Sequence, residues 1–476
     1  MNMRGRSRRV CLFLLTVALI ASGLTTSGQP AKAVAAEDRI GFSHGGVSGS
    51  WRLPWLNDSE LAWELDGVAN SGARWLRLDF NWPSMQPTPT TWNWEPVDRV
   101  VRGATARGLQ VLAMPAYSPS WARPGGTDDK YPPSDRQTYA RFVQEAVCHY
   151  RPMGVRNWEI WNEPNQAHWW KPKPDPWAYT DLLRRAYAAI KAEDPNATVV
   201  AAGMAPAPDS ADGSEINAVT FARRMYQSGA KGNFDALAMH PYNYPVEPMY
   251  PASWNAFSST TPAIHQVMEE NGDGWKKVWL TEYGAPTSGP RAISEGAQAE
   301  FLVKAYDQVV KWPWAGPLFY YSYRDQGWDA NNTDDNFGLI RRDWRWKAGM
   351  SAFRDEMNKP RAGQSRLGPG QQLPSGSRLI SADLRYNLTM QGDGNLVLTD
   401  QAGRSIWSTG SYGNPGSSLR MQNDGNLVVY NPSGRVLWST GTYGNSGSSL
   451  VVQNDRNLVV YNVGGRSIWA SGTYER

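Results

Sequence analysis

The feature that most constrains the fold is a repeat at the C-terminal end of the chain. Three units follow one another with a period of 31 residues, which recurring residues mark: Gln391, Gln422 and Gln453; Trp407, Trp438 and Trp469. Each unit holds short alternating apolar runs and turns rich in Gly, Ser and Asn, a pattern typical of antiparallel strands. Units this small cannot fold alone. We therefore expect an all-β, three-fold β-prism over residues 371–476, with the Trp side chains stacked at its centre.

Residues 37–357 show a different pattern, in which short apolar runs alternate with helical stretches. The runs predict strands near 39–42, 74–80, 109–115, 155–161, 197–203, 234–240, 277–282 and 317–323. Eight strand–helix units in about 320 residues favour a (β/α)8 TIM barrel of the α/β class. A doubly wound open sheet is the alternative, but no Gly-rich phosphate loop follows the first strand. Residues 358–370 are predicted to form a linker or the start of the C-terminal domain.

The N-terminus reads as a signal peptide over residues 1–36. Four Arg residues precede an apolar run, Val10–Ile20, and small residues follow as far as Ala36, as in secretory signals. The run is too short for a membrane anchor in the mature form, so we expect a secreted, extracellular protein; Sec and twin-arginine export both stay open. Without this segment the formal charge of +4 falls close to zero, and we expect no nucleic-acid partner.

Cysteine and histidine usage argues against a disulfide framework and a metal centre. Cys148 is the only cysteine after the signal segment, and we expect it to be buried in a helix that includes residues 139–148. The five His residues are scattered and form no pairs at ligand spacing. The sequence therefore predicts no metal and no cofactor.

Two carboxylates stand at the ends of predicted strands. Glu163 follows the fourth strand and Glu282 ends the seventh, each among Trp, Asn or Tyr residues. The C-terminal ends of barrel strands carry catalytic groups, and hydrolysis of a glycosidic bond needs one protonated and one ionised carboxyl. Glu282, as the ionised partner, is expected to keep an ordinary or lowered pKa. The 24 Trp and 21 Tyr residues of the chain suit either a large aromatic core or the stacking of sugar rings.

Two motifs resemble those of clan A glycoside hydrolases, with families 39 and 5 nearest. The segment Trp161–Asn165 (WNEPN) resembles the acid/base motif, and Trp279–Gly284 (WLTEYG) resembles the nucleophile strand. The resemblance covers residues 37–357 and implies a retaining β-glycosidase, with Glu163 as acid/base and Glu282 as nucleophile. It also implies that Asn162 contacts the sugar 2-OH.

Further positions match the clan. His240 and Tyr242, after the sixth strand, resemble its His-x-Tyr pair at the reactive sugar, although His240 could be structural. Arg77 resembles an arginine beneath the nucleophile, and it could equally hold the barrel floor. Trp121 lies in a stretch that resembles a substrate-stacking loop. The clan's Trp at the end of the eighth strand is missing here, and Tyr323 or Trp328 is expected to replace it.

The C-terminal repeat resembles the mannose-binding motif of bulb-type monocot lectins, Gln-x-Asp-x-Asn-x-Val-x-Tyr. Alternate residues of a strand share one face, so Gln, Asp and Asn there can bind sugar hydroxyls; in that family the Asp and Asn recognise the axial 2-OH of mannose. Two copies are intact and the first has Thr399 in place of Tyr, so its site should be weaker. The predicted mannose contacts are Gln422, Asp424, Asn426 and Tyr430; Gln453, Asp455, Asn457 and Tyr461; Gln391, Asp393 and Asn395.

Together these patterns predict a secreted, retaining β-glycosidase that cleaves internal bonds of a polysaccharide, with mannose-containing glycans bound by its C-terminal module. One alternative is an exo-acting β-xylosidase. Another, from a different class, is a non-catalytic lectin or toxin on an inactive barrel; the presence of both Glu163 and Glu282 argues against it.

Overall fold

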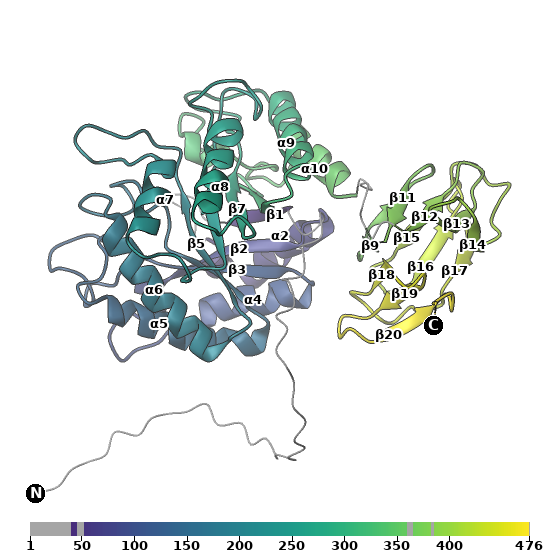
Figure 1. Ribbon diagram of the computed structural model, residues 1–476, viewed down its shortest axis with the longest axis horizontal. Helices are drawn as coiled ribbons and strands as arrows, with labels where there is room; N and C mark the ends of the chain where they lie inside the picture. Colours follow the sequence, from purple (N-terminus) through teal and green to yellow (C-terminus); the bar gives the residue numbers. More distant parts are fainter. Residues whose placement is uncertain (1–39, 45–51, 359–364, 382–384, 476) are drawn as a thin grey trace, which may run out of the picture.

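The computed structural model describes residues 40–44, 52–358, 365–381 and 385–475. Two lobes follow one another along the chain: a barrel surrounded by helices, and a smaller lobe made of strands (Figure 1). The predicted signal peptide lies outside the described residues. Within them, no helix combines the length and apolar character needed to cross a bilayer.

The first lobe is a closed barrel of eight parallel strands in sequence order. The sequence-based prediction of a (β/α)8 barrel is thereby confirmed. The strands are β1 (Ile40–His44), β2 (Trp75–Asn81), β3 (Gln110–Ala116), β4 (Asn157–Ile160), β5 (Thr198–Met204), β6 (Ala236–Met239), β7 (Lys277–Tyr283) and β8 (Ala315–Tyr320).

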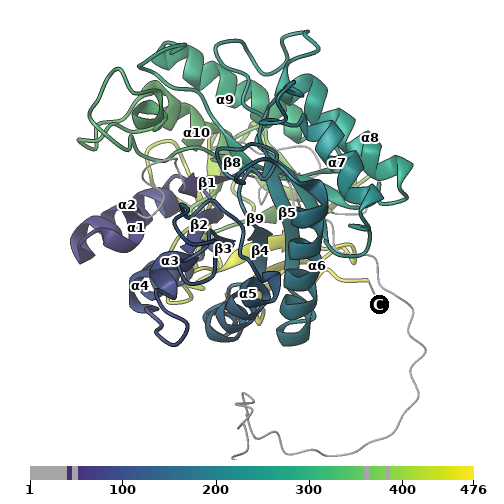
Figure 2. The same cartoon turned by 90° about the vertical axis from the view of Figure 1, so that its left-hand side faces the viewer.

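Helices surround the strands, as Figure 2 shows with the barrel lobe facing the viewer. Side chains on the outer face of the strands and the inner face of the helices form one large apolar cluster. A second cluster, which includes Trp75, Trp279 and Phe319, fills the barrel. The helices are α1 (Arg52–Trp55), α2 (Asp58–Asn70), α3 (Trp82–Met85), α4 (Glu95–Ala106), α5 (Arg136–Tyr150), α6 (Pro176–Glu193), α7 (Ala218–Gln227), α8 (Thr261–Glu270), α9 (Glu295–Val309) and α10 (Ala348–Asn358).

Local sequence explains where several helices begin. Asn57, Asp135, Asp175, Asn217 and Ser294 each precede a helix and accept a hydrogen bond from a backbone N–H of its first turn. Such caps satisfy donors that the helix itself leaves unpaired.

The helix expected around Cys148 is present as α5, but the burial expected of its thiol is wrong. Cys148 is only half-buried, because the buried stripe of α5 passes through its neighbours Ala146 and Val147 instead.

The second lobe consists of three four-stranded antiparallel sheets. Trp407, Trp438 and Trp469 contact one another, with ring centroids 5.5 to 6.0 Å apart. We expected these rings to stack, and that expectation is wrong. They meet edge to face, an arrangement that the quadrupoles of aromatic rings favour. The strands are β9 (Arg366–Leu367), β10 (Gln372–Leu373), β11 (Arg378–Ile380), β12 (Tyr386–Met390), β13 (Leu396–Asp400), β14 (Ser405–Ser408), β15 (Ser418–Met421), β16 (Leu427–Tyr430), β17 (Val436–Ser439), β18 (Ser449–Val452), β19 (Leu458–Tyr461) and β20 (Ser467–Ala470).

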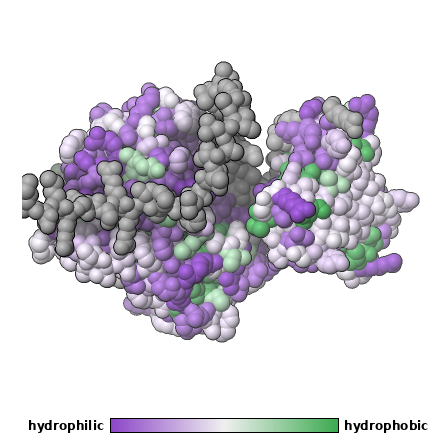
Figure 3. All heavy atoms as spheres, turned by 90° about the horizontal axis from the view of Figure 1, so that it is seen from below, coloured by the Kyte–Doolittle hydropathy of each residue, from purple (hydrophilic) through white to green (hydrophobic). Residues whose placement is uncertain are grey.

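The lobes are joined at the end of the barrel where the strands begin. β9 already pairs with β18, so the expected linker 358–370 contains the first strand of the C-terminal lobe. Arg74, directly before β2, donates to the carbonyl of Pro369 (3.5 Å), and Gln371 donates to the carbonyl of Met357 near the end of α10 (3.3 Å). On the face shown in Figure 3, hydrophobic residues form small separate patches on both lobes.

Candidate active site

The strand ends opposite the C-terminal lobe carry a cluster of buried charged side chains. Arg77 on β2 is fully buried, and its guanidinium donates to Glu159 (2.5 Å), Glu282 (2.6 Å) and the Oδ1 atom of Asn162 (3.2 Å). Because a guanidinium has no acceptor, it orients the Asn162 amide with its oxygen inward. The NH2 group of Asn162 is left to donate to a ligand.

Glu282 is held through both of its oxygens. Arg77 binds Oε1, and the hydroxyl of Tyr242 donates to Oε2 at 2.8 Å. Thr281 and Glu282 are consecutive, yet both reach the cluster, because the pairing of β7 with β8 shifts register between Leu280 and Tyr283. An irregularity of this kind re-aims a side chain at a strand end.

Glu163 projects from the loop after β4 on a strained backbone. Trp161 and Glu163 have positive φ values of 71° and 40°, which cost about 1–3 kcal/mol each and persist only where the surroundings impose them. The indole of Trp161 donates to the carbonyl of Trp169 (2.9 Å), and the backbone N–H of Glu163 donates to the carbonyl of Gly203 (3.1 Å). These contacts fix a half-buried carboxyl at the barrel mouth.

His240 links the two carboxyls. Its Nδ1 lies 2.7 Å from Glu163 and 3.5 Å from Glu282, and its Nε2 lies 3.1 Å from the hydroxyl of Thr281. That hydroxyl donates its only proton to Glu159 (2.8 Å), so it must accept from the Nε2–H of His240. The variable proton of the ring is therefore the one on Nδ1, facing Glu163.

The charges of the cluster shift its pKa values strongly. Burial lowers the pKa of His240, but Glu282 and the hydrogen bonds to Glu159 and Glu163 outweigh burial and raise it to about 9. Burial also raises the pKa of Glu159, yet Arg77 and His240 bring it down to about 2. His240 is thus a cation and Glu159 an anion at neutral pH.

The expectation of an ordinary or lowered pKa for Glu282 is wrong. Burial is the largest influence on this carboxyl and raises its pKa, with a further increase from Glu163; His240, Arg77 and Tyr242 act in the opposite direction. The sequence predicted Arg77 beneath Glu282 but not that the Glu282 side chain would be almost completely enclosed.

Three site residues escaped the sequence analysis. Glu159 is fully buried in β4, four residues before Glu163, and its signal was a charged residue inside an apolar strand. Thr281 bridges Glu159 and His240. Gly203, at the end of β5, donates its N–H to Glu159 (2.9 Å); a Cβ there would lie 2.0 Å from the His240 ring. Nothing in the local pattern marks this glycine.

One of the predicted sugar-stacking residues lies elsewhere. Tyr323 points away from the barrel mouth, since a Cβ on Gly67 of α2 would touch its hydroxyl, and the prediction for Tyr323 is wrong. The ring that packs on Tyr242 after β8 is Tyr321, with centroids 6.3 Å apart. Trp121 is half-buried, contacts the Trp82 ring and donates to the carbonyl of Gln86 (3.0 Å).

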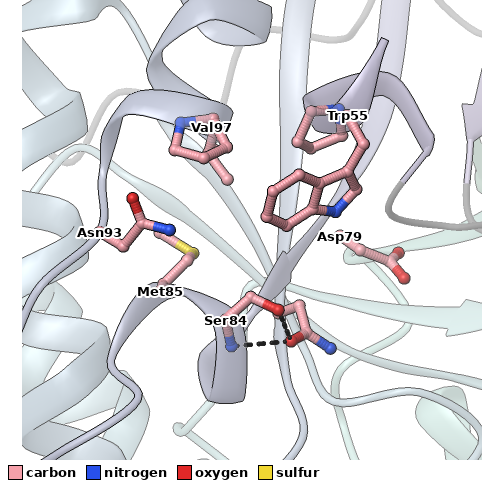
Figure 4. A pocket seen from close by; sticks show the side chains of 9 residues that line it. Trp55, Asp79, Ser84, Met85, Asn93 and Val97 are labelled. Carbon is pink, nitrogen blue, oxygen red and sulfur yellow. Dashed lines mark hydrogen bonds between the residues drawn. The ribbon is translucent and has the colours of Figure 1, made fainter.

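A small cavity opens beside β2, between Trp55 and Asp79 (Figure 4). Its wall includes Asn81, whose Oδ1 accepts hydrogen bonds from the N–H and the hydroxyl of Ser84 (3.0 and 2.7 Å). The cavity volume is about 20 Å³, which is room for about one water molecule. It is too small for a sugar residue.

The cluster also has the spacing of a cation site. One ligand atom each from Glu163, His240 and Glu282 lie within 4.8 Å of one another. In the structure the Nδ1 atom of His240 is already hydrogen-bonded to Glu163, so a metal ion would have to displace that contact. The absence of a metal from the working enzyme remains a prediction.

Comparison with known families identifies the barrel. The sequence model of the cellulase family (glycosyl hydrolase family 5) matches residues 34–316. The chain belongs to this family. A cellulase-family chain with this barrel is a glycoside hydrolase, as the WNEPN and WLTEYG motifs implied. The match ends at the start of β8, so it does not include the segment of Tyr321 and Tyr323.

Solved structures show the same fold in other glycoside hydrolases. A family 39 glycoside hydrolase from the gut symbiont Bacteroides cellulosilyticus WH2 has a TM-score of 0.56 and 19% identity, over 90% of this chain and 80% of that chain. A monomeric β-xylosidase from Caulobacter crescentus CB15 has a TM-score of 0.55 and 17% identity, over 78% of this chain and 74% of that chain. At these identities the likeness shows the fold alone.

Shorter chains of another kind also match. A monomeric monocot mannose-binding lectin from Gastrodia elata is 38% identical over 24% of this chain and 100% of that chain, with a TM-score of 0.22. No curated protein matches the chain.

Proposed function

We propose that this glycoside hydrolase is a secreted, retaining β-glycosidase that cleaves internal bonds of a polysaccharide by double displacement. The observation that carries the proposal is the pairing of Glu163 and Glu282 across His240. Retaining enzymes place their two carboxyl groups about 5–5.5 Å apart, whereas inverting enzymes leave room for a water molecule between them. One oxygen of Glu163 and one of Glu282 lie within 4.8 Å of each other, and this close approach supports the proposal of a retaining arrangement.

The hydrogen-bond partners support Glu163 as acid and Glu282 as nucleophile. Arg77 and His240 supply two positive charges, and Glu159 and Glu282, both bound to Arg77, supply two negative charges. Arg77 and Tyr242 bind both oxygens of Glu282, which suits the carboxylate that attacks, and the half-buried Glu163 at the barrel mouth is the carboxyl proposed to protonate the leaving oxygen.

In the first step, the Glu163 proton passes to the glycosidic oxygen as the bond between that oxygen and the anomeric carbon breaks. Glu282 attacks the anomeric carbon and forms a glycosyl ester, while its other oxygen stays within reach of Arg77 or Tyr242. In the second step, water attacks the anomeric carbon, Glu163 takes the water proton, and the ester bond breaks. The NH2 group of Asn162 is the donor proposed for the sugar 2-OH.

For the C-terminal lobe we propose a β-prism that binds mannose-containing glycans. In the second and third repeats the Gln side chain donates to the Tyr hydroxyl, Gln422 to Tyr430 (2.7 Å) and Gln453 to Tyr461 (2.8 Å). In all three repeats the Asn oxygen accepts hydrogen bonds from the following turn, and its NH2 group is the donor proposed for a sugar hydroxyl. Thr399 in the first repeat lacks the ring that completes this frame.

The test is hydrolysis of β-mannan, β-glucan, xylan and aryl β-glycosides, with the anomer formed first identified by proton NMR. We expect a β product. Glu163→Gln and Glu282→Gln should each lose about 10²–10⁴-fold in rate or more, the usual contribution of such groups. Glu145→Gln, an exposed glutamate on α5, is the matched control. An α product would overturn retention, and an active Glu282→Gln variant would overturn the nucleophile and favour a different site.

A further inference from the structure

A second, larger pocket opens between the loops that follow β7 and β8. Its volume is about 250 Å³, more than ten times that of the cavity beside β2, and is enough for one sugar residue. Thr287 and Ser288 come from the β7 loop, and Trp328 and Asn336 from the β8 loop. Both loops leave the barrel at the end that carries Glu282.

The pocket is lined mainly by polar and charged residues, including four cations. Three of these are committed to carboxylates on the pocket wall: Lys347 to Asp325 (2.7 Å), Arg345 to Asp343 (2.7 Å) and Arg341 to Glu295. Lys347 also contacts Thr287 and the carbonyl of Asn336, which uses all three of its protons. The contacts of Lys347 with Thr287 and of Arg341 with Glu295 hold the two loops together. Lys347 has no free donor left for a ligand.

Arg342 is the exception. It is half-buried, and no carboxylate pairs with it among the described residues. Burial lowers the pKa of Arg342 without an acid to offset it, so the pocket contains a positive charge that the protein only partly solvates. An incoming carboxylate would gain a bidentate, charge-assisted contact there.

We propose that this pocket binds the carboxylate-bearing residue of an acidic polysaccharide, with Arg342 as the partner of the carboxylate and Trp328 as the stacking surface. Trp328 is 75% exposed at the pocket, and a flat apolar ring so placed can cover one face of a sugar. The inference rests on the proposed polysaccharide-cleaving function and specifies its substrate as one that carries acidic sugars.

The pocket and the nucleophile are separated by one layer of aromatic rings. Asn336 lines the pocket, and its neighbour Phe337 packs against Tyr242 (5.8 Å between centroids) and Tyr321 (5.2 Å). Tyr242 in turn donates to Glu282. An acidic sugar held in the pocket would therefore belong to the same polysaccharide as the sugar cleaved at Glu282. It would be a different sugar residue of that polysaccharide.

Direct titration tests the proposal without requiring turnover. The full chain is titrated calorimetrically with sodium D-glucuronate, with D-glucose and with sodium sulfate, at matched ionic strength. We expect glucuronate to bind at least about tenfold more tightly than glucose, the least that a charge-assisted hydrogen bond contributes. Arg342→Gln should abolish this difference. Arg141→Gln, an exposed arginine on α5 outside the pocket, is the matched control and should retain it.

Each other outcome overturns the inference. Equal binding of glucuronate and glucose, or a preference that survives Arg342→Gln, excludes Arg342 as the carboxylate partner. If sulfate binds as tightly as glucuronate, depends equally on Arg342, and Trp328→Ala has no effect, the pocket binds anions in general. It then does not recognise a sugar. The glycosidase proposal can fail independently of this inference. Its test is the activity of the Glu163 and Glu282 variants on neutral substrates.

Discussion

At the scale of single residues, Glu159 organises the site without facing the substrate. It is fully buried and accepts hydrogen bonds from Arg77, Thr281 and the backbone of Gly203. Through Thr281 it fixes the proton on the Nε2 atom of His240, and its charge helps to keep His240 protonated. Glu159 is thus a positioning residue whose effect reaches Glu163 through the imidazole.

Glu159→Gln is predicted to move the alkaline limb of the activity profile to lower pH. Removing a buried negative charge disfavours the imidazolium, so the pKa of His240 falls from about 9. When His240 loses its Nδ1 proton, it can no longer donate a hydrogen bond to Glu163, the positive charge between the two carboxyls disappears, and the rate declines. We expect the limb near pH 9 to shift down by about one unit, measured as kcat against pH on an aryl glycoside.

Two comparisons separate this effect from simple misfolding. Thr281→Val keeps the charge of Glu159 but removes the link to Nε2 of His240, and it should also lower the limb. Glu145→Gln, on the surface of α5, should leave it in place. A Glu159→Gln enzyme that is folded by circular dichroism and keeps the wild-type limb would contradict the role given to Glu159.

At the scale of elements, the sequence predicted the strands well and their ends poorly. Apolar runs bounded by turns located all eight strands to within a few residues, because burial on both faces of a parallel strand leaves a continuous apolar signal. The register shift in β7 and the outward orientation of Tyr323 left no such signal. Both depend on packing between segments far apart in the chain.

Gly203 shows the same limit, and it gives a sharp test. A methyl group at this position would meet the His240 ring at 2.0 Å and the Thr281 hydroxyl at 2.7 Å. Gly203→Ala should therefore displace His240 from Glu163, cost about 1–3 kcal/mol of stability through overpacking, and lower kcat much more than it raises KM. Thermal unfolding and steady-state kinetics measure the two effects.

Gly125→Ala is the matched control for this change. Gly125 lies in the loop after β3, and a Cβ there meets no atom within 4 Å. We expect wild-type stability and activity. Unchanged kcat in Gly203→Ala would show that His240 tolerates displacement, and that its contact with Glu163 does not matter for turnover.

At the scale of the whole molecule, the two lobes face different directions. The catalytic cluster lies where the barrel strands end, whereas Arg74 and Met357 contact the C-terminal lobe where β2 begins and α10 ends. The sugar motifs therefore cannot complete the active site. Under the proposed function, the C-terminal lobe acts by raising the local concentration of the enzyme on a mannose-bearing polymer.

Replacing Asp424 and Asp455 together with Ala in the full chain tests this arrangement. Each loses its proposed contact with the 2-OH of mannose, at ~1–3 kcal/mol per site, so binding to mannose resin and activity on an insoluble mannose-rich polymer should fall. Turnover of small soluble glycosides should stay unchanged, as it should after deletion of residues 366–476. Asp400→Ala, on the same lobe but paired with Arg404 outside the motifs, should leave resin binding intact. Undiminished resin binding by the double variant would exclude these two motifs as the mannose sites, and loss of activity on small glycosides after the deletion would show that the C-terminal lobe stabilises the barrel.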